Sequence, residues 1–370
     1  MSRLTILARF AALIAIGLAL EACAGGSSPR IPASADFNAA AYRSRIESII
    51  SQWDSRGGSS IQPPAGWNRR VPGEAAVSAA WWGFNDRDSA GSLQAALDSG
   101  VQVVLVPKMP TPWIITRTLH FRSGGVELLL EPGVEIVAAE GAFRGGGDSL
   151  IEADGVADFS ILGYGATLRM RKRDYQKAPY EKAEWRHAIS LRGVARARIA
   201  GLRIESSGGD GIYVGTLRTH EARQPCEDLT LQDLEIHDSL RQGVSVISAR
   251  RLVIENCLIA GTSGAHPMSG IDFEPNSGDP GFTDCVVRGC RIERNGGIGL
   301  LLVLSKLGQE AAPVSVRVQD CEIDNFPIAV WLHGLENRVR GNLTFSGNTV
   351  RGMQLLRGSS YFSVVFARKP

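Results

Sequence analysis

Three carboxylic acids lie beside glycine-rich turns and short apolar stretches of the sequence. Asp272 and Glu274 are two residues apart in a short apolar stretch, and Asp210 ends the turn sequence Ser-Ser-Gly-Gly-Asp. Residues two apart in a strand share a face and lie about 6.6–7 Å apart along the backbone. A protonated and an ionised carboxyl group side by side are what acid/base cleavage of a glycosidic bond requires. We therefore predict catalytic roles for Asp210, Asp272 and Glu274, although such acids are also ordinary on a solvated strand or in a turn.

Basic and aromatic residues surround these acids. Arg241 falls between Asp210 and Asp272, where it could hold an anionic group of a ligand or form an ordinary salt bridge. The segment 169–187 mixes basic with aromatic residues, and aromatic faces stack on sugar rings while arginines bind acidic substituents. This segment could instead be a solvated insertion that packs on the fold, and His237 could simply pair with nearby acids. The predicted substrate-binding residues are Arg241, His237, Tyr213, Arg186, Trp185, Tyr175 and His266.

The elements that must position these residues repeat along the chain. Each unit begins with the pattern apolar, x, apolar, two turn-prone residues, apolar, x, Ile, and a second short strand follows at or near a glycine. A constant strand pattern with turns of variable length predicts an all-β solenoid, a parallel β-helix in which each coil stacks on the next. The second strand is marked at intervals of 27 to 32 residues by Ile212, Val244, Ile271, Ile298 and Ile328.

The cysteines follow the same repeat. Cys257, Cys290 and Cys321 occupy the position of the first-strand pattern that Leu234 fills, so we predict a column of buried thiols rather than disulfides. The sequence contains no Cys-x-x-Cys pair, and we predict no zinc site.

Helical patterns precede the predicted solenoid. Residues 88–100 begin with Asp and Ser, place Leu93, Ala96 and Leu97 on one face and stop at a glycine, which predicts a short helix that caps the first coil. Residues 35–53 carry apolar residues at near-helical spacing, which predicts an amphipathic helix against the coils. The expected segments are a signal peptide at 1–22, a linker at 23–36, a helical segment and linker at 37–75, and the β-helix at 76–368.

The first residues have the pattern of an export signal. Two arginines precede an apolar run of ten residues, too short to cross a bilayer, and small residues follow it. Leu20-Glu-Ala-Cys23 resembles the lipobox of bacterial lipoproteins, although Glu21 is unusual there and ordinary cleavage after Ala24 also fits. We expect lipidation at Cys23 and a location in the cell envelope (periplasm or outer membrane) or secretion, with the membrane contacted only through that anchor.

Several stretches resemble a known superfamily. Leu128-Leu-Leu-Glu-Pro-Gly-Val-Glu-Ile136, with residues 84–98 and 103–107, resembles the entry of the pectin-lyase-like, right-handed parallel β-helix superfamily, and residues 169–187, 206–213, 241–246 and 270–275 resemble its secreted bacterial members found in polysaccharide-degrading contexts. The resemblance covers about residues 80–335 and implies a site on the outside of the second strand. Asp210 falls where polygalacturonases place the Asp of an Asn-Thr-Asp motif, but Arg241-Gln242 replaces their next Asp-Asp. A different sugar or linkage is therefore implied.

Together these patterns predict an exported glycoside hydrolase that acts on an acidic polysaccharide, as a monomer and without cofactor or metal. The first alternative is a polysaccharide lyase or epimerase that uses Arg241, His237 or Lys306 as base or charge-neutralising group. The second alternative is a non-catalytic glycan-binding surface protein. With 40 Lys and Arg against 38 Asp and Glu, the formal charge is +2, which together with the export signal argues against nucleic acid as a partner.

Overall fold

The computed structural model describes residues 33–69 and 75–367. The predicted signal peptide at 1–22 and the lipidation of Cys23 lie outside these residues. Within the described ranges, no helix is both long enough and apolar enough to span a membrane.

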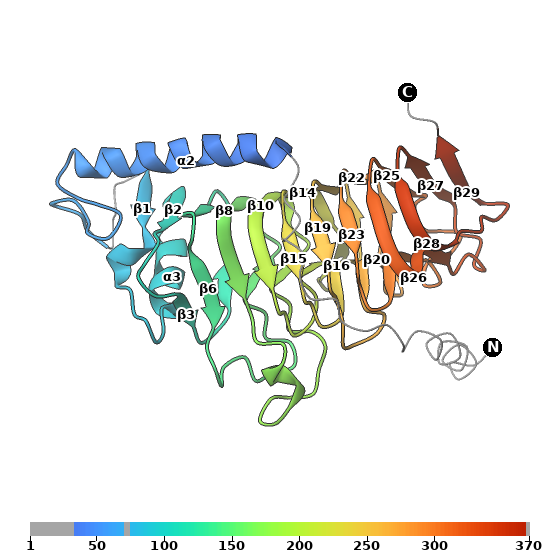
Figure 1. Cartoon of the computed structure of the whole chain (residues 1–370), viewed down its shortest axis with the longest axis horizontal. Helices are drawn as coiled ribbons and strands as arrows, with labels where there is room; N and C mark the ends of the chain where they lie inside the picture. The colour runs from blue at the N-terminus through green and yellow to red at the C-terminus, as the bar shows by residue number, and fades with distance from the viewer. Residues whose placement is uncertain (1–32, 70–74, 368–370) are drawn as a thin grey trace. The chain divides into compact units, whose positions relative to one another are not determined.

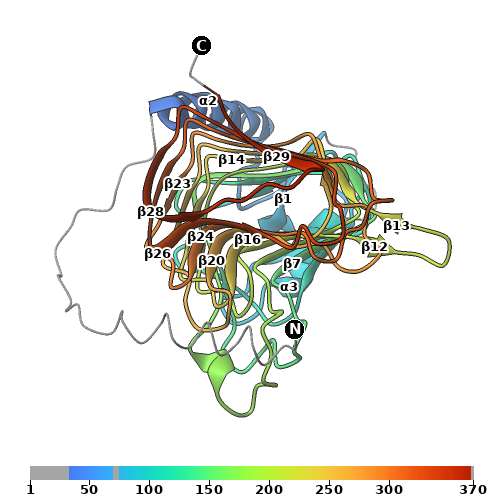
Figure 2. The ribbon, with the colours of Figure 1, turned by 90° about the vertical axis from the view of Figure 1, so that its right-hand side faces the viewer.

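Short parallel strands stack into coils, and each coil contributes to three sheets (Figures 1 and 2). Sheet 1 consists of β1 (Ala76–Ser78), β2 (Val103–Val106), β5 (Glu127–Leu130), the first parts of β8 (Ala157–Arg169) and β10 (Ala195–Glu205), β14 (Cys226–Gln232), β17 (Ala249–Arg250), β18 (Val253–Glu255), β21 (Phe282–Thr283), β22 (Cys285–Arg288), β25 (Val314–Gln319), β27 (Gly341–Ser346) and β29 (Phe362–Ala367). Sheet 2 consists of β3 (Trp113–Ile115), β6 (Glu135–Ala138), the second parts of β8 and β10, β15 (Glu235–His237), β19 (Leu258–Ala260), β23 (Arg291–Glu293), and the first parts of β26 (Glu322–His333) and β28 (Thr349–Leu355).

Sheet 3 corresponds to the second strand of the sequence repeat. It consists of β4 (Leu119–Phe121), β7 (Ile151–Asp154), β9 (Ile189–Arg192), β11 (Ile212–Gly215), β16 (Gln242–Val246), β20 (Ser269–Phe273), β24 (Ile298–Val303), and the second parts of β26 and β28. Two strands, β12 (Leu217–Arg218) and β13 (Arg223–Gln224), form a separate antiparallel hairpin. The predicted all-β parallel β-helix is confirmed.

Two helices lie where helical patterns were found. The short helix α3 (Ala90–Leu97) buries Leu93 at the first coil, as expected of a cap, and the 3₁₀ helix η1 (Ala79–Trp82) packs beside it. The long helix α2 (Ala33–Asp54) runs along the outside of the coils (Figure 1). Its Tyr42 hydroxyl accepts the Leu130 N–H at 2.9 Å and lies 2.6 Å from the carbonyl oxygen of Leu162, so one buried side chain ties the helix to two coils.

A column of glycines sets the register of sheet 3. A Cβ atom on Gly211, Gly243 or Gly270 would lie 2.6–2.7 Å from the carbonyl oxygen of the next glycine in the column, which for Gly270 is Gly299. Leu300 therefore pairs with Ile271, and the predicted alignment of Ile298 with Ile271 is wrong by two residues. The shift matters for the site because it places Leu301, rather than a glycine, beside Asp272.

The interior is apolar and contains the predicted thiol column. All five cysteines in the described part of the chain are buried and free, and the thiols of Cys257, Cys290 and Cys321 interact with one another. The contact with the Cys290 thiol, together with burial, raises the pKa of the Cys321 thiol far above its usual range. The column is thus part of the core and presents no reactive thiolate.

Candidate functional site

The outer face of sheet 3 brings the predicted site residues onto one column. In register, His120 of β4, Glu152 of β7, Ser190 of β9, Tyr213 of β11, Ser245 of β16 and Asp272 of β20 lie side by side. Beyond Asp272 the column becomes apolar, with Leu301 of β24 next. The chemistry-bearing part of the column therefore ends at β20.

Asp210 stands at the entrance of β11 and is completely buried. Neither carboxyl oxygen has a hydrogen-bond partner among the described residues, although Oδ2 lies 3.2 Å from His187 Nδ1 and Oδ1 lies 3.9 Å from Arg241 Nη1. Burial raises the pKa of Asp210 to about 7, against the opposing effect of Arg241. Asp210 can therefore hold a proton near neutral pH.

Asp272 is also fully buried, while Glu274 is partly exposed. Gln242 Nε2 donates a hydrogen bond to Asp272 Oδ2, and Asp272 Oδ1 has no hydrogen-bond partner within the described part of the chain. Burial and the neighbouring Glu274 raise the pKa of Asp272 well above its usual range. The outward direction predicted for Asp272 agrees with its column, but its burial leaves it no surface for direct contact with a ligand.

Arg241 connects the acids, as its place in the sequence predicted. Its Nη2 lies 3.5 Å from Glu274 Oε2, its Nε lies 3.8 Å from Glu184 Oε1, and its Nη1 donates to Gln242 Oε1 at 2.8 Å. Burial lowers the pKa of Arg241, but the acids around it, Asp210 first, outweigh this effect and raise it. One guanidinium thus lies within 4.0 Å of carboxyl oxygens of Asp210, Glu184 and Glu274, and a proton on one of these acids would limit their mutual repulsion.

A groove passes over these residues. One part of it is a cavity of about 420 Å³ whose lining includes Trp185, His187, Tyr213, Arg241 and Glu274. Adjoining cavities of about 310 and 390 Å³ share lining residues with it, so the three form one groove over β4, β7, β9 and β11. We call this the sheet 3 groove.

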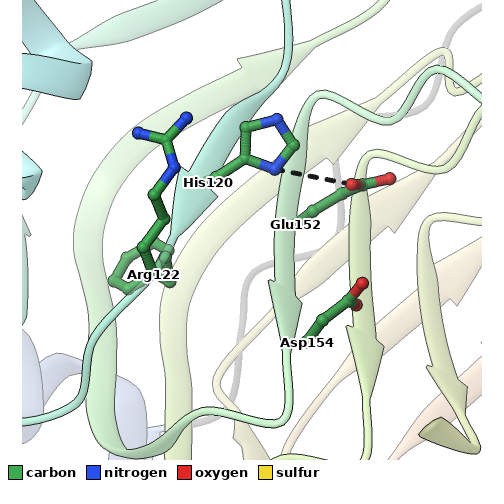
Figure 3. A pocket seen from close by; sticks show the side chains of 5 residues that line it. His120, Arg122, Glu152 and Asp154 are labelled. Atoms are coloured by element: carbon green, nitrogen blue, oxygen red, sulfur yellow. Dashed lines mark ion pairs between the residues drawn. The ribbon is translucent and has the colours of Figure 1, made fainter. Parts of the chain in front are cut away.

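Charged side chains line the far end of the sheet 3 groove. Figure 3 shows His120 and Glu152 pointing toward one another, with His120 Nδ1 3.6 Å from Glu152 Oε2. Asp154 lies on the same strand as Glu152 and accepts two hydrogen bonds from Arg192, at 2.7 and 2.6 Å. In contrast, Arg218 at the edge of the groove forms no ion pair with any residue that the structure describes. The groove therefore offers an available cation for an anionic ligand.

The insertion 169–187 divides into anchors and exposed groups. Arg186 is buried, donates to the carbonyl oxygens of Phe143 and Arg144, and lies over the buried Tyr175 ring at 5.2 Å. The predicted substrate contacts of Arg186 and Tyr175 are therefore corrected, because both side chains fix the insertion and neither is at the surface. Trp185, in contrast, is 56% exposed and lines the cavity.

The two histidines predicted to bind substrate, His237 and His266, do not line the groove. His237 belongs to β15 of sheet 2 and lies 3.5 Å from Glu235, which is the pairing with acids that was the alternative. His266 is exposed on the turn before β20, and Lys306 on the turn after β24. None of the three lines the cavities of the groove.

Three residues that were not among the predicted site residues complete the site. His187 lines the cavity, stacks on Tyr213 with ring centroids 4.7 Å apart, and has its pKa lowered to about 3 by burial, Arg241 and Arg192. Glu184 and Gln242 contact Arg241. No repeat or motif marks His187 and Glu184, which lie at the end of the irregular insertion. Among the described side chains, no group of three or more His, Cys, Asp and Glu is arranged to hold a metal ion.

Known proteins share the fold. A family model described as a right handed beta helix region matches residues 181–363. A stretch of 96 residues is 32% identical to the uncharacterized protein YclG of Bacillus subtilis (strain 168), which is 25% of this chain and only 16% of that protein.

Solved structures show the same likeness over more of the chain. A 1,3-α-1,4-β-D-galactose-4-sulfate-3,6-anhydro-D-galactose-2-sulfate 4 galactohydrolase has a TM-score of 0.53 at 11% identity and covers 76% of this chain and 72% of its own. An endo-xylogalacturonan hydrolase from Aspergillus tubingensis has a TM-score of 0.50 at 12% identity and covers 78% and 76%. At 11% and 12% sequence identity, these similarities show a shared fold and nothing further.

Proposed function

Because this chain has the right-handed parallel β-helix fold of pectin-lyase-like proteins, we propose that it is an exported glycoside hydrolase that cleaves an acidic polysaccharide. One observation carries the proposal: Glu274 and the buried Asp210 flank the same guanidinium at the wall of a long groove. Two solved structures of the same fold are named as hydrolases of a sulfated galactan and of xylogalacturonan, which supports the choice of substrate class.

The site supplies both a general base and a source of acid, which hydrolysis of a glycosidic bond needs. Glu274 reaches the cavity as a carboxylate paired with Arg241 and can accept a proton from water. Asp210 holds a proton near neutral pH and is the source of the acid. Burial and the neighbouring Glu274 raise the pKa of Asp272 well above its usual range, which favours its protonated form and so limits the negative charge beside the pair.

An acidic glycan fits the groove better than a neutral one. Arg218 has no anionic partner among the described residues, and Arg241 lines the cavity with a side chain that is 17% exposed. Arginine binds carboxylate and sulfate groups through paired hydrogen bonds. The lyase or epimerase alternative has less support, because His237 and Lys306, two of the three groups proposed for it, are remote from the groove.

A screen of the purified protein against acidic and neutral polysaccharides tests the proposal. We expect an acidic polysaccharide to be shortened and the neutral ones to remain intact. Shortening of neutral chains alone would contradict the proposed substrate class, and binding without any cleavage would favour the glycan-binding alternative.

Trp185→Ala is expected to raise KM for that polysaccharide about tenfold with a smaller change in kcat. The exposed indole at the cavity rim would be covered by a sugar ring, and burying such a surface is worth about 1–2 kcal/mol. Phe326→Ala is the matched control, because Phe326 is 70% exposed on β26 and does not line the groove. Equal KM values in the two variants would exclude Trp185 as a sugar-binding platform.

We also propose that the protein is exported and attached to the cell envelope through lipid at Cys23. Cys23→Ser removes the thioether but leaves Ala22-Ser-Ala24 as an ordinary cleavage site. Wild-type protein is expected in the membrane fraction and the variant in the soluble fraction. Wild-type protein found wholly in the soluble fraction would show that cleavage follows Ala24.

A further inference from the structure

Beside the acids, the sheet 3 groove has a second pocket with a polar and basic lining. This pocket is the cavity of about 310 Å³, and its lining includes Tyr213, Arg218 and Asn276. Tyr213 and Asn276 also line the cavity that contains Glu274. A ligand bound at Glu274 therefore extends directly into this second pocket, which we call the Arg218 pocket.

The hairpin formed by β12 and β13 carries Arg218 and projects from the side of the coils (Figure 2). Its base packs on glycines of the two preceding coils. A Cβ atom on Gly193 would lie 2.5 Å from Leu217 Cβ, and one on Gly155 would lie 2.9 Å from Leu217 Cδ2. Because these glycines let Leu217 approach the coils closely, Arg218 is held at the edge of the groove.

The same hairpin places two arginines opposite one another. Arg218 and Arg223 are register partners on its two strands. Arg223 is neutralised within the fold, since its Nη1 lies 3.4 Å from Asp279 Oδ1, and Asp279 Oδ2 also accepts the backbone N–H of Asn276 at 3.0 Å. Within residues 33–69 and 75–367, Arg218 forms no ion pair. Like charges directly opposite in a sheet are destabilising, so an anion beside Arg218 would stabilise the hairpin.

The charges that line the Arg218 pocket do not balance. Arg192 and Arg218 carry two positive charges and Asp154 one negative charge, and Asp154 is paired with Arg192 at 2.7 and 2.6 Å. Burial raises the pKa of Tyr213 to about 12, so its hydroxyl keeps its proton at neutral pH. The Asn276 side chain is exposed. The pocket therefore offers one unpaired guanidinium and two neutral hydrogen-bond donors.

We propose that the Arg218 pocket binds an anionic substituent, a carboxylate or a sulfate, on a sugar that adjoins the one at Glu274. Oxygens of both groups accept paired hydrogen bonds from a guanidinium. Arg218 would then determine the preference for an acidic glycan without contact with the reacting atoms. The inference rests on the proposed hydrolase function and places the acidic group beside the catalytic acids rather than among them.

Sulfate and acetate test the pocket without any polysaccharide. In the full chain labelled with nitrogen-15 arginine, NMR follows the Nε–H signals of the guanidinium groups, and Arg218→Gln identifies the signal of Arg218. We expect one or both anions, exchanged for chloride at constant ionic strength, to shift this signal until it saturates. Arg357, exposed after β28 and outside the groove, is the matched control, and Arg357→Gln identifies its signal.

The control signal should shift without saturation. Responses of Arg218 to both anions that are no different from those of Arg357 would overturn the proposal. Because no polysaccharide is used, this outcome is separate from a failure of the proposed hydrolase function.

Urea unfolding distinguishes an anion-binding arginine from a structural one. Arg218→Gln removes the like-charge contact with Arg223, so the variant should unfold at the same urea concentration as wild type or at a higher one. Unfolding at a clearly lower concentration would show that Arg218 supports the hairpin and would contradict its assignment to a ligand.

Kinetics show what the pocket contributes to the proposed reaction. On the acidic polysaccharide that the protein cleaves, Arg218→Gln is expected to raise KM by about tenfold or more with little change in kcat, and Arg357→Gln should match wild type. Methyl esterification removes carboxylates and desulfation removes sulfates, so the treatment that abolishes the difference between Arg218→Gln and wild type identifies the anion. A difference in KM that persists after both treatments would overturn the proposal.

Discussion

Glu274→Gln is expected to reduce kcat on the cleaved polysaccharide by about 10²- to 10⁴-fold, the usual contribution of a general base. Glu274 is the member of the acid set that lines the cavity directly, and glutamine preserves its size but cannot accept the proton of water. KM should change little, since the Arg241 side chain remains in place.

Asp272→Asn is the matched comparison. Asp272 is buried and its pKa is raised well above its usual range by burial and Glu274, so asparagine resembles the favoured protonated form and can still accept the hydrogen bond from Gln242. We expect less than a tenfold loss of kcat. Wild-type turnover in Glu274→Gln would remove Glu274 from the mechanism, and a larger loss in Asp272→Asn than in Glu274→Gln would transfer the principal role to Asp272.

Asp210→Asn and His187→Gln are expected to give opposite changes in the way the free energy of unfolding depends on pH. In the unfolded chain near pH 5, the imidazole carries a proton and the carboxyl is ionised, because their ordinary pKa values are 6.5 and 3.8. In the folded chain the pKa of His187 is lowered to about 3 and that of Asp210 is raised to about 7, so the carboxyl carries the proton. The pair therefore holds one proton in both the folded and the unfolded chain. Between about pH 4 and pH 6.5, the effects of the two groups on the pH dependence of the free energy of unfolding cancel.

Each single variant retains the effect of only one of the two groups on the pH dependence of the free energy of unfolding. Without Asp210, the lowered pKa of His187 remains, so stability is lost as pH falls from 6.5 toward 3. Without His187, the raised pKa of Asp210 remains, so stability is lost as pH rises from 3.8 to about 7. For each variant, the difference in the free energy of unfolding from wild type changes with pH by up to about 1.4 kcal/mol per pH unit.

Urea unfolding of the three proteins at several pH values between 4 and 7 measures these slopes. Other titrating groups, Asp272 among them, are common to all three proteins and cancel in the differences. Curves of both variants that run parallel to the wild type would show that the pair does not exchange a proton on folding.

The coils were predictable because their signals are local. The strand pattern repeats within each coil, and stacking of adjacent coils is enough to bring Asp210, Arg241 and Asp272 together. The thiol column followed from the same periodicity. The register near β24 was not predictable by matching Ile298, because either glycine of Gly297-Ile-Gly299 could continue the glycine column, and only backbone contacts across coils select Gly299.

The burial of the acids and the role of the insertion could not be deduced from the pattern. Asp272 is enclosed partly because the register shift places Leu301 beside it. Within the insertion, no periodicity separates the anchor Arg186 from its exposed neighbour Trp185. His187 follows directly, and its contact with Asp210 depends on how the insertion returns to β9.

Cleavage of an acidic polysaccharide in oxygen-18 water, followed by mass spectrometry of the products, tests the hydrolase most directly. Hydrolysis places one labelled oxygen at each new reducing end, so we expect this label with wild-type protein and little product with Glu274→Gln. Unlabelled products with unsaturated uronate ends would contradict the proposed hydrolysis and show that the protein is a lyase.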